Sequence, residues 1–171
     1  MPWGAGGGAD GDGTVTISPV LYASDKMDWE TPQWLFDLLD EEFDFELDVC
    51  ATHENRKCSL YYTKEIDALA EGSGWLGVAW CNPPYGREIR NWVKKAYEES
   101  VTGATVVLLI PARTDTAYYH DYIWPYACEM RFIRGRLKFV GGSSAAPFPS
   151  VVVVFRPDRT GPPQVSTIEK P

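Results

Sequence analysis

The chain has 171 residues, of which 44% are hydrophobic, and a formal net charge of −8. This length is sufficient for one domain with a substantial core, and the acidic balance excludes a protein that coats nucleic acid nonspecifically. No apolar run is long enough to cross a membrane, and the four cysteines form no CxxC pair. We therefore expect a cytoplasmic protein with reduced thiols, no membrane partner and no metal site.

Both ends of the sequence differ from its middle. Residues 1–22 are rich in glycine and poor in large apolar side chains, and residues 157–171 have a similarly weak apolar pattern. Such compositions are typical of flexible tails. The remaining residues, 23–156, contain no internal repeat and no linker, which predicts one folded domain.

The first predicted element is a helix that follows the tripeptide "ETP". Thr31 is suited to cap this helix, and Pro32 occupies the favoured first position. The apolar residues at helical spacing, which would form its buried face, are Trp34, Leu35, Leu38 and Leu39.

Short strands and helices then alternate along the chain. Strands are predicted at 45–51, 60–63, 78–81 and 105–111, and helices at 86–100 and 114–123. The residues expected to face inward from the helix at 86–100 are Ile89, Trp92, Val93, Ala96 and Tyr97. Thr114 or Asp115 would cap the shorter helix.

Two final strands, at 129–140 and 148–155, are close enough in sequence to pair as an antiparallel hairpin. The whole order indicates an α/β open sheet. Only about 34 residues separate Asp48 from Asn82, which is less than complete strand–helix repeats require. We therefore expect an abridged sheet in which at least one crossover helix is short or missing.

Three suggestive segments fall where strands are expected to end. They are "DVCATHEN" from Asp48, "NPPYG" from Asn82 and "PARTD" from Pro111. Ligands of open α/β sheets bind outside the carboxyl ends of the strands, so these segments should converge. In the second one, Pro83 and Pro84 make a stiff turn that leaves backbone carbonyls free.

These segments resemble a known family of enzymes. "NPPY" after an apolar strand is similar to the catalytic motif of amino-group methyltransferases that use S-adenosylmethionine. Together with "WETPQWLFDLLDEEFDFELDVCAT", "LLIPARTDTAYYH" and "IRGRLKF", it resembles the small phage-type DNA adenine-N6 methyltransferases, the Dam-like family. The likeness spans about Asp28 to Phe155 and implies an abridged Rossmann-like sheet. For a phage-encoded chain, the expected location is the cytoplasm of the bacterial host.

The chemistry of this family explains the residue types in the motif. The exocyclic amine of adenine is a poor nucleophile because its lone pair is delocalised into the ring. The resemblance implies that the side-chain oxygen of Asn82 and the carbonyl of Pro83 accept the two amine hydrogens, while Tyr85 stacks on the base. An adenine inside a duplex must be flipped out to reach such a pocket. Positioning and electrostatics then suffice without a metal.

The resemblance also implies a site for S-adenosylmethionine. The carboxylate of Asp48 would bind the cationic amino group of the methyl donor, with Cys50 and Ala51 in the same segment. Other residues implied to border the donor are Thr31, Pro32, Asp67 and Asn82. Two alternatives from the residues themselves stay open: Asp48 can cap the turn that follows it, and Thr31 and Pro32 can be simple helix caps.

Basic residues in the second half of the chain are candidates for DNA contact. These are Arg87, Arg113, Arg134, Arg136 and Lys138. The alternative for Arg113 is a surface ion pair. The alternative for the hairpin residues Arg134, Arg136 and Lys138 is a solvated edge strand. The loop at 141–149, "GGSSAAPFP", has no Arg, Lys, Asn or Gln to read base edges, which predicts a short or relaxed target sequence.

Three other functions fit parts of the pattern. Enzymes that methylate RNA adenine or a protein glutamine amide carry the same motif, and a cofactor-free DNA-binding module would keep the fold without the reaction. The intact Asn-Pro-Pro-Tyr favours an enzyme over the module. The motif alone does not separate the amine substrates.

Overall fold

The structure is a computed structural model, and it describes residues 29–171. The tail expected at residues 1–22 therefore lies outside the described residues. The helices are α1 (Gln33–Phe43), α2 (Ile89–Val101), the π-helix η2 (Tyr119–Ile123) and α3 (Trp124–Tyr126). The strands are β1 (Leu47–Asp48), β2 (Leu60–Tyr61), β3 (Val78–Cys81), β4 (Thr105–Pro111), β5 (Glu129–Ile133), β6 (Ser150–Phe155) and β7 (Gln164–Ile168).

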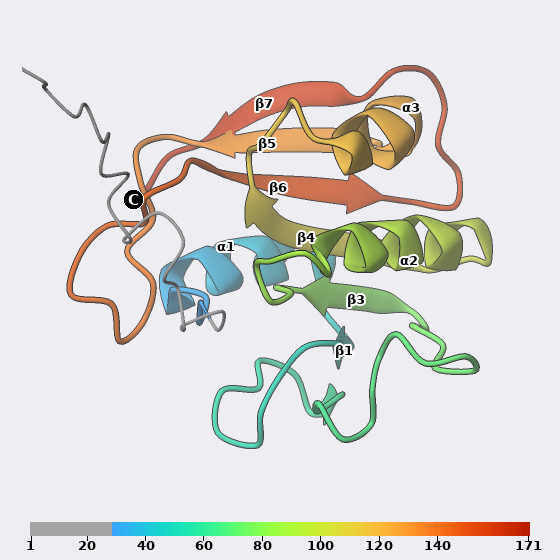
Figure 1. Ribbon diagram of the computed structural model, residues 1–171, viewed down its shortest axis with the longest axis horizontal. Helices are drawn as coiled ribbons and strands as arrows, with labels where there is room; N and C mark the ends of the chain where they lie inside the picture. The colour runs from blue at the N-terminus through green and yellow to red at the C-terminus, as the bar shows by residue number, and fades with distance from the viewer. Residues whose placement is uncertain (1–28) are drawn as a thin grey trace, which may run out of the picture.

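The strands form one sheet in the order β2-β1-β3-β4-β6-β5-β7 (Figure 1). Strands β2, β1, β3 and β4 run parallel to one another, whereas β6 is antiparallel to both β4 and β5. The predicted α/β class and the antiparallel pairing of the two late strands are therefore confirmed. Within the described residues no helix lies between β1 and β3, as expected for an abridged sheet.

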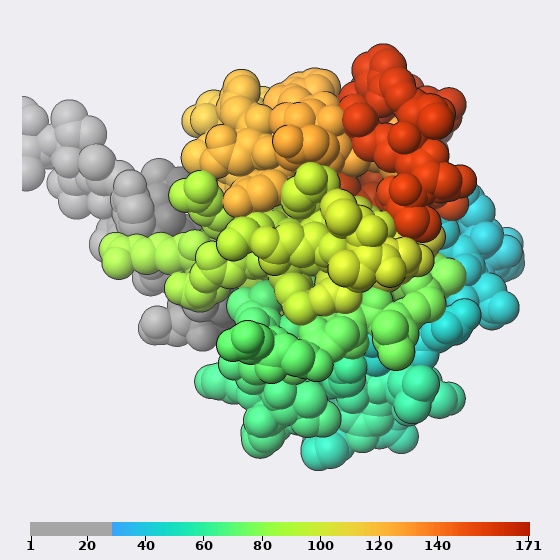
Figure 2. Space-filling model, turned by 90° about the vertical axis from the view of Figure 1, so that its right-hand side faces the viewer, coloured from blue at the N-terminus to red at the C-terminus, as the bar shows by residue number. Residues whose placement is uncertain are grey.

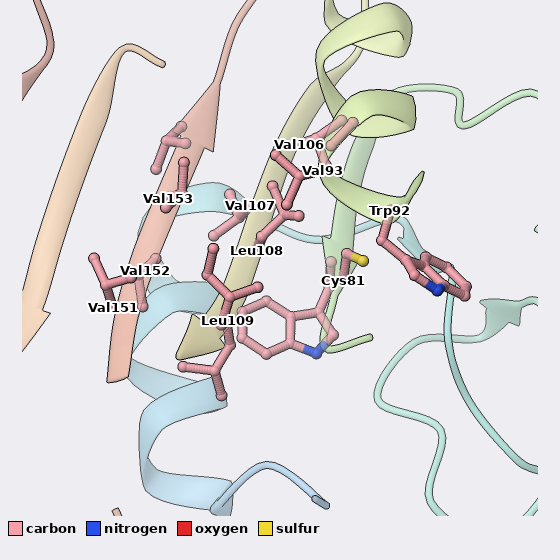
Figure 3. Packing of buried hydrophobic residues seen from close by; sticks show 14 of the residues in the cluster. Cys81, Trp92, Val93, Val106, Val107, Leu108, Leu109, Val151, Val152 and Val153 are labelled. Carbon is pink, nitrogen blue, oxygen red and sulfur yellow. The ribbon is translucent and has the colours of Figure 1, made fainter. Parts of the chain in front are cut away.

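The helices cover both faces of this sheet. Trp80 of β3 packs edge-on against Phe36 of α1, with ring centroids 5.7 Å apart. Cys81, next along the strand, points to the opposite face and lies near Trp92 of α2 (Figure 3). Figure 2 shows α2 (yellow-green) crossing one side of the molecule, between the α3 region (orange) and the segment that precedes β3 (green).

The core is centred on β4 and β6. Every residue of β6 and all but the first of β4 are buried, and the two strands pair over six residue positions. Figure 3 shows valine and leucine side chains of both strands on the side of the sheet where Val93 of α2 lies, close to Val106. Burial on both faces explains why these strands have continuous apolar sequences instead of an alternating pattern.

The structure corrects the expected face of the first helix. Leu38 is 38% exposed, and the buried residues are Leu35, Phe36, Leu39 and Phe43. Pro32 occupies the cap position without a side-chain hydrogen bond, so Thr31 does not cap the helix. Of the expected inward residues, Leu35 and Leu39 are buried and Trp34 is only partly buried. Phe36 and Phe43 complete the buried face, and both contact the ring of Phe45.

Two further expectations about helix and strand ends are wrong. No side chain caps η2, so the caps expected from Thr114 or Asp115 are not formed. Strand β5 ends at Ile133, and Gly135 adopts a φ of 77°, which is left-handed backbone that terminates the strand. Arg134, Arg136 and Lys138 consequently lie in the β5–β6 loop (134–149) and not on a strand.

The expected C-terminal tail contains a strand of the sheet. Gln164–Ile168 forms β7, which pairs in parallel with β5. Only Ile168 of this edge strand is buried, so backbone pairing holds the strand and almost no apolar pattern marks it. No described helix is long and apolar enough to span a lipid bilayer.

Candidate active site at the strand carboxyl ends

The sheet has a topological switch point between β1 and β3. From β1 the chain moves outward to β2, and it then returns to the other side of β1 to form β3. Open α/β sheets bind ligands at the carboxyl ends of the strands at such a point. Asp48 is the last residue of β1, and Asn82 directly follows β3. The predicted convergence of these residues at one edge is confirmed by the parallel pairing.

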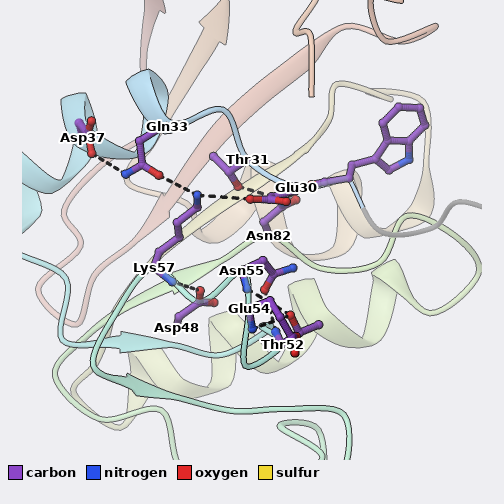
Figure 4. A network of polar contacts seen from close by, with 11 residues as sticks. Glu30, Thr31, Gln33, Asp37, Asp48, Thr52, Glu54, Asn55, Lys57 and Asn82 are labelled. Carbon is purple, nitrogen blue, oxygen red and sulfur yellow. Dashed lines mark hydrogen bonds and ion pairs between the residues drawn. The ribbon is translucent and has the colours of Figure 1, made fainter. Parts of the chain in front are cut away.

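Asn82 is held in one orientation by the segment that precedes α1. Its side-chain nitrogen donates hydrogen bonds to the carbonyl oxygen of Trp29 and to the hydroxyl of Thr31, the latter at 2.9 Å (Figure 4). With both amide hydrogens engaged, the side-chain oxygen is fixed on the opposite side. Thr31 is almost fully buried, so it belongs to the site through Asn82 and not as a helix cap.

Tyr85 is bound to Asn82 from the other direction. Its hydroxyl lies 2.9 Å from the side-chain oxygen of Asn82 and 3.1 Å from the carbonyl oxygen of Leu109. One phenolic hydrogen serves two acceptors, so it can be donated to either. Burial holds the pKa of Tyr85 well above its ordinary value, and the hydroxyl therefore remains a donor at neutral pH.

Two phenylalanines cover the ring of Tyr85, and Trp29 packs against both of them. We call Trp29, Phe139 and Phe148 the aromatic cover. Phe148 and Phe139 meet the Tyr85 ring edge-on, with centroids 5.4 and 6.2 Å away, and Tyr85 is only 8% exposed. Stacking of Tyr85 on a base would therefore require the β5–β6 loop, which carries both phenylalanines, to move.

Asp48 is a buried carboxylate held by backbone groups. It is 3% exposed, and its two oxygens accept hydrogen bonds from the backbone N–H groups of Cys50 (3.2 Å) and Lys57 (3.0 Å). Burial raises the pKa of Asp48, and these two hydrogen bonds oppose the shift. Asp48 thus caps the turn after β1, and among the described residues no cationic side chain forms a salt bridge with it.

A polar network joins this turn to the start of α1. The ammonium of Lys57 donates to the side-chain oxygen of Gln33 at 2.8 Å and lies 3.8 Å from the carboxylate of Glu30 (Figure 4). The backbone carbonyl of Glu30 in turn accepts a hydrogen bond from Val140 in the β5–β6 loop. The loop after β1, the segment before α1 and the β5–β6 loop therefore support one another around Asn82.

The other residues predicted to border a methyl donor are not all connected to Asp48 and Asn82. The backbone of Cys50 binds Asp48, and the N–H of buried Ala51 donates to the carbonyl of Tyr62. Asp67 is exposed in the segment before β3, where its carboxylate accepts from the N–H of Leu69. No contact joins Asp67 to the other predicted residues in the described part of the chain.

The basic residues of the second half divide into paired and unpaired groups. Ion pairs involve Arg90 with Asp121, Lys94 with Glu98, Lys95 with Glu99, Arg131 with Glu42 and Glu129, and Arg134 with Glu169. Within residues 29–171, no salt bridge forms at Arg87, Arg113, Arg136 or Lys138. In the β5–β6 loop, exposed Arg136 and Lys138 alternate with buried Leu137 and Phe139, so the cations point away from the aromatic cover.

Arg87 and Arg113 line a pocket beside the motif. This arginine pocket has a volume of about 220 Å³ and is lined among others by Tyr85, Arg87, Arg90, Pro111, Arg113 and Tyr118. Tyr118 is 6% exposed, and its hydroxyl has no hydrogen-bond partner among the described residues. The sequence analysis did not identify Tyr118 or the aromatic cover. The spacing of apolar residues predicts which side chains are buried, but it does not predict which residues of different elements contact one another.

Residues 29–171 contain no cluster of His, Cys, Asp and Glu with the geometry of a metal site. They also contain all four cysteines, none of which forms a disulfide bond.

Comparison with known proteins agrees with this geometry. Residues 20–171 match the family model described as DNA N-6-adenine-methyltransferase (Dam). A DNA N-6-adenine-methyltransferase of Haemophilus phage HP1 is 31% identical over 144 residues, which are 78% of this chain and 81% of that protein. One of Escherichia phage T1 is 30% identical over 131 residues, covering 68% of this chain and 55% of that longer relative.

Proposed function

Since the chain belongs to the DNA N-6-adenine-methyltransferase (Dam) family, we propose that it transfers a methyl group from S-adenosylmethionine to the N6 amine of a flipped-out adenine in DNA. The observation that carries this proposal is the fixed amide of Asn82 at the carboxyl end of β3. Both of its hydrogens are bound by the protein, so its oxygen is presented as an acceptor. An acceptor in that position suits an exocyclic amine.

The motif would activate the amine by binding its two hydrogens. The side-chain oxygen of Asn82 and the backbone carbonyl of Pro83 would each accept one, which draws the nitrogen toward tetrahedral geometry and directs its lone pair outward. The hydroxyl of Tyr85 would then donate to the carbonyl of Leu109, already 3.1 Å away, and release the oxygen of Asn82. Pro84 keeps the turn rigid, so these acceptors are placed before the base arrives.

Asp48 and its surroundings fit the cationic end of S-adenosylmethionine. Burial has raised the pKa of this carboxylate, and no cationic side chain forms a salt bridge with it in the described region. A ligand ammonium would supply a directly bound positive charge, and we propose that Cys50, Ala51, Thr31 and Pro32 border the donor as well. Bound beside Asp48, S-adenosylmethionine would present an electrophilic sulfonium methyl group. The switch point between β1 and β3 also supports a Rossmann-like sheet.

The aromatic cover would have to open for the adenine. Phe139 and Phe148 lie on the β5–β6 loop, whose outer surface carries Arg136 and Lys138. Contact of these cations with DNA phosphates would therefore be coupled to the position of the loop over Tyr85. Phosphate contacts carry no sequence information, and 141–149 has no residue suited to read base edges, so we propose a short or relaxed target sequence.

The direct test is methylation with labelled S-adenosylmethionine and, separately, duplex DNA, RNA or protein. We expect label in DNA, recovered as N6-methyladenine after digestion, and mapping on mixed genomic DNA should show adenines with at most one or two fixed neighbours. Label confined to RNA or protein would assign a different amine substrate. A folded protein that binds the donor and methylates none of the three would overturn the enzyme proposal, and a single motif of four or more fixed bases would overturn the relaxed specificity.

A further inference from the structure

The arginine pocket carries positive charge that ion pairs with the described residues only partly neutralise. It lies between the NPPYG turn, the end of β4 and the first turn of α2, and three arginines line it. Arg90 is paired with Asp121 at 3.0 Å, whereas Arg87 and Arg113 form no salt bridge within residues 29–171. No acidic residue lines the pocket in that part of the chain. In a chain with a net charge of −8, two uncompensated guanidinium groups at one pocket indicate an anionic ligand.

A second and independent observation is the hydroxyl of Tyr118. This side chain lines the same pocket and is 6% exposed, yet its hydroxyl forms no hydrogen bond of normal geometry among the described residues. Its neighbour Thr116, which also lines the pocket, is close enough to lower the pKa of Tyr118 against the effect of burial. A buried polar group without a partner is costly and rare in native proteins, and it often marks a place that a ligand completes. Burial raises the pKa of Tyr118, so the group is a neutral donor at physiological pH.

The donors around the pocket suit a phosphate. Guanidinium groups bind phosphate oxygens in a planar, two-point geometry, and a phenol adds a single donor. The pocket also borders the N-terminal turn of the 13-residue helix α2, whose dipole favours negative charge. Tyr85 lines the pocket and also binds Asn82, so the pocket adjoins the proposed adenine site directly.

We propose that the arginine pocket binds the backbone phosphate next to the flipped adenine, through Arg87, Arg113 and the hydroxyl of Tyr118. This inference rests on the proposed function. It assigns the pocket a positioning role: holding one defined phosphodiester fixes the extruded nucleotide relative to Asn82. The cations of the β5–β6 loop lack such a defined pocket and would contact the duplex less specifically.

Methylphosphonate scanning tests this assignment. In a duplex that the wild type methylates at one adenine, each phosphodiester near that adenine is replaced in turn by a neutral methylphosphonate. In the wild type, we expect a methylphosphonate at one position, within one nucleotide of the adenine, to weaken duplex binding about tenfold. In Arg113→Gln, that penalty should disappear, and the slope of log binding constant against log salt concentration should become smaller in magnitude by about 0.9. Lys94→Gln, an equal charge change on exposed α2, should keep both the penalty and its position.

Tyr118→Phe gives a readout that a structural role would not produce. Removing an unpartnered buried hydroxyl should leave thermal stability unchanged or raise it, while weakening binding of the same duplex several-fold. Inorganic phosphate should compete with the duplex for the wild type more strongly than for Arg113→Gln. A pocket that takes free phosphate as its ligand would instead show this competition with no methylphosphonate-sensitive position.

The outcomes separate this inference from the proposed function. A wild type that methylates DNA, but shows no position-specific penalty or an equal penalty in Arg113→Gln, overturns the phosphate pocket alone. Unchanged duplex affinity in Tyr118→Phe removes the tyrosine from the site. A wild type that fails to methylate any DNA overturns the proposed function itself.

Discussion

The centre of the sheet and its β1–β3 side are built in different ways. In the centre, β4 and β6 pair over six residue positions, and nearly every side chain is apolar and buried. At the other side, β1 and β2 have two residues each, and no helix joins β1, β2 and β3 in the described residues. There, hydrogen bonds between side chains and backbone groups replace the extended strand pairing: Asp48 accepts from two backbone N–H groups, and Asn82 donates to the carbonyl of Trp29.

The two regions therefore have different roles, one in the stability of the fold and the other in ligand binding. In the centre, buried apolar area adds to the backbone pairing of β4 and β6 and stabilises the fold. The β1–β3 side leaves polar groups at the strand ends, where they can bind a ligand, and depends on the centre for support. Changes in the centre should therefore affect folding, and changes at the strand ends should affect binding and rate.

Leu108→Ala in β4 should have the largest effect. The side chain is fully buried between the covering layers, so its truncation should lower the free energy of unfolding by about 2–5 kcal/mol. Denaturant unfolding measures this loss. Leu76→Ala, at a residue that is 80% exposed, is the control and should change stability little. Equal losses in the two variants would mean that the centre does not dominate stability.

Asn82→Ala should lower the rate of methyl transfer by about 10²-fold or more, because one preorganised hydrogen-bond partner of the amine is lost. Single-turnover kinetics with saturating donor measure this rate. Donor affinity should change little, and Asn91→Ala, which removes an exposed amide from α2, should keep the wild-type rate. Near-normal turnover in a folded Asn82→Ala protein would exclude the proposed acceptor role.

Asp48→Ala should weaken donor binding by about 1.5–3 kcal/mol if the charged hydrogen bond is direct. Titration calorimetry tests this, with Asp37→Ala on the exposed side of α1 as control. Because the Asp48 turn also loses its cap, Asp48→Asn, which retains one acceptor oxygen, is the second variant. Unchanged affinity in both Asp48 variants would leave this residue a purely structural role.

The same residue predicts a pH dependence. Burial raises the pKa of Asp48, so protonation begins at a higher pH than for an ordinary aspartate, and donor affinity should fall as the pH falls through this raised pKa. In the free protein the folded state binds this proton more tightly than the unfolded chain does. The group's contribution to stability therefore declines as the pH rises from the ordinary pKa through the raised one. Asp48→Asn should lack both dependences.

Tyr85→Phe should have the smallest effect of the series. The ring and its contacts with the aromatic cover remain, and only the hydroxyl shared between Asn82 and Leu109 is lost, worth about 0.5–1.5 kcal/mol. We expect a several-fold lower rate with unchanged donor affinity. Tyr122→Phe, whose hydroxyl has no role in the proposed site, is the matched control. A loss as large as that of Asn82→Ala would mean that the hydroxyl acts in the reaction itself.

The sequence by itself determined the order of the elements and the position of the central residues. Helical spacing identified the inward face of α2, and continuous apolar residues identified β4, because burial leaves a periodic pattern along the chain. The proline turn placed Asn82 at the end of β3 for a local reason that needs no tertiary contact. Asp48 was located by the short strand pattern that precedes it, at the end of β1.

Only the tertiary structure decided which residues meet. The partners of Asn82 lie 51 and 53 residues earlier in the chain, and Arg131 binds Glu42 from 89 residues away. Periodicity reports that a side chain is buried or exposed, and it contains no information about a partner on another element. For this reason the pairing of Arg131, the aromatic cover over Tyr85 and the edge strand β7 escaped prediction, whereas the strand-end position of the site did not.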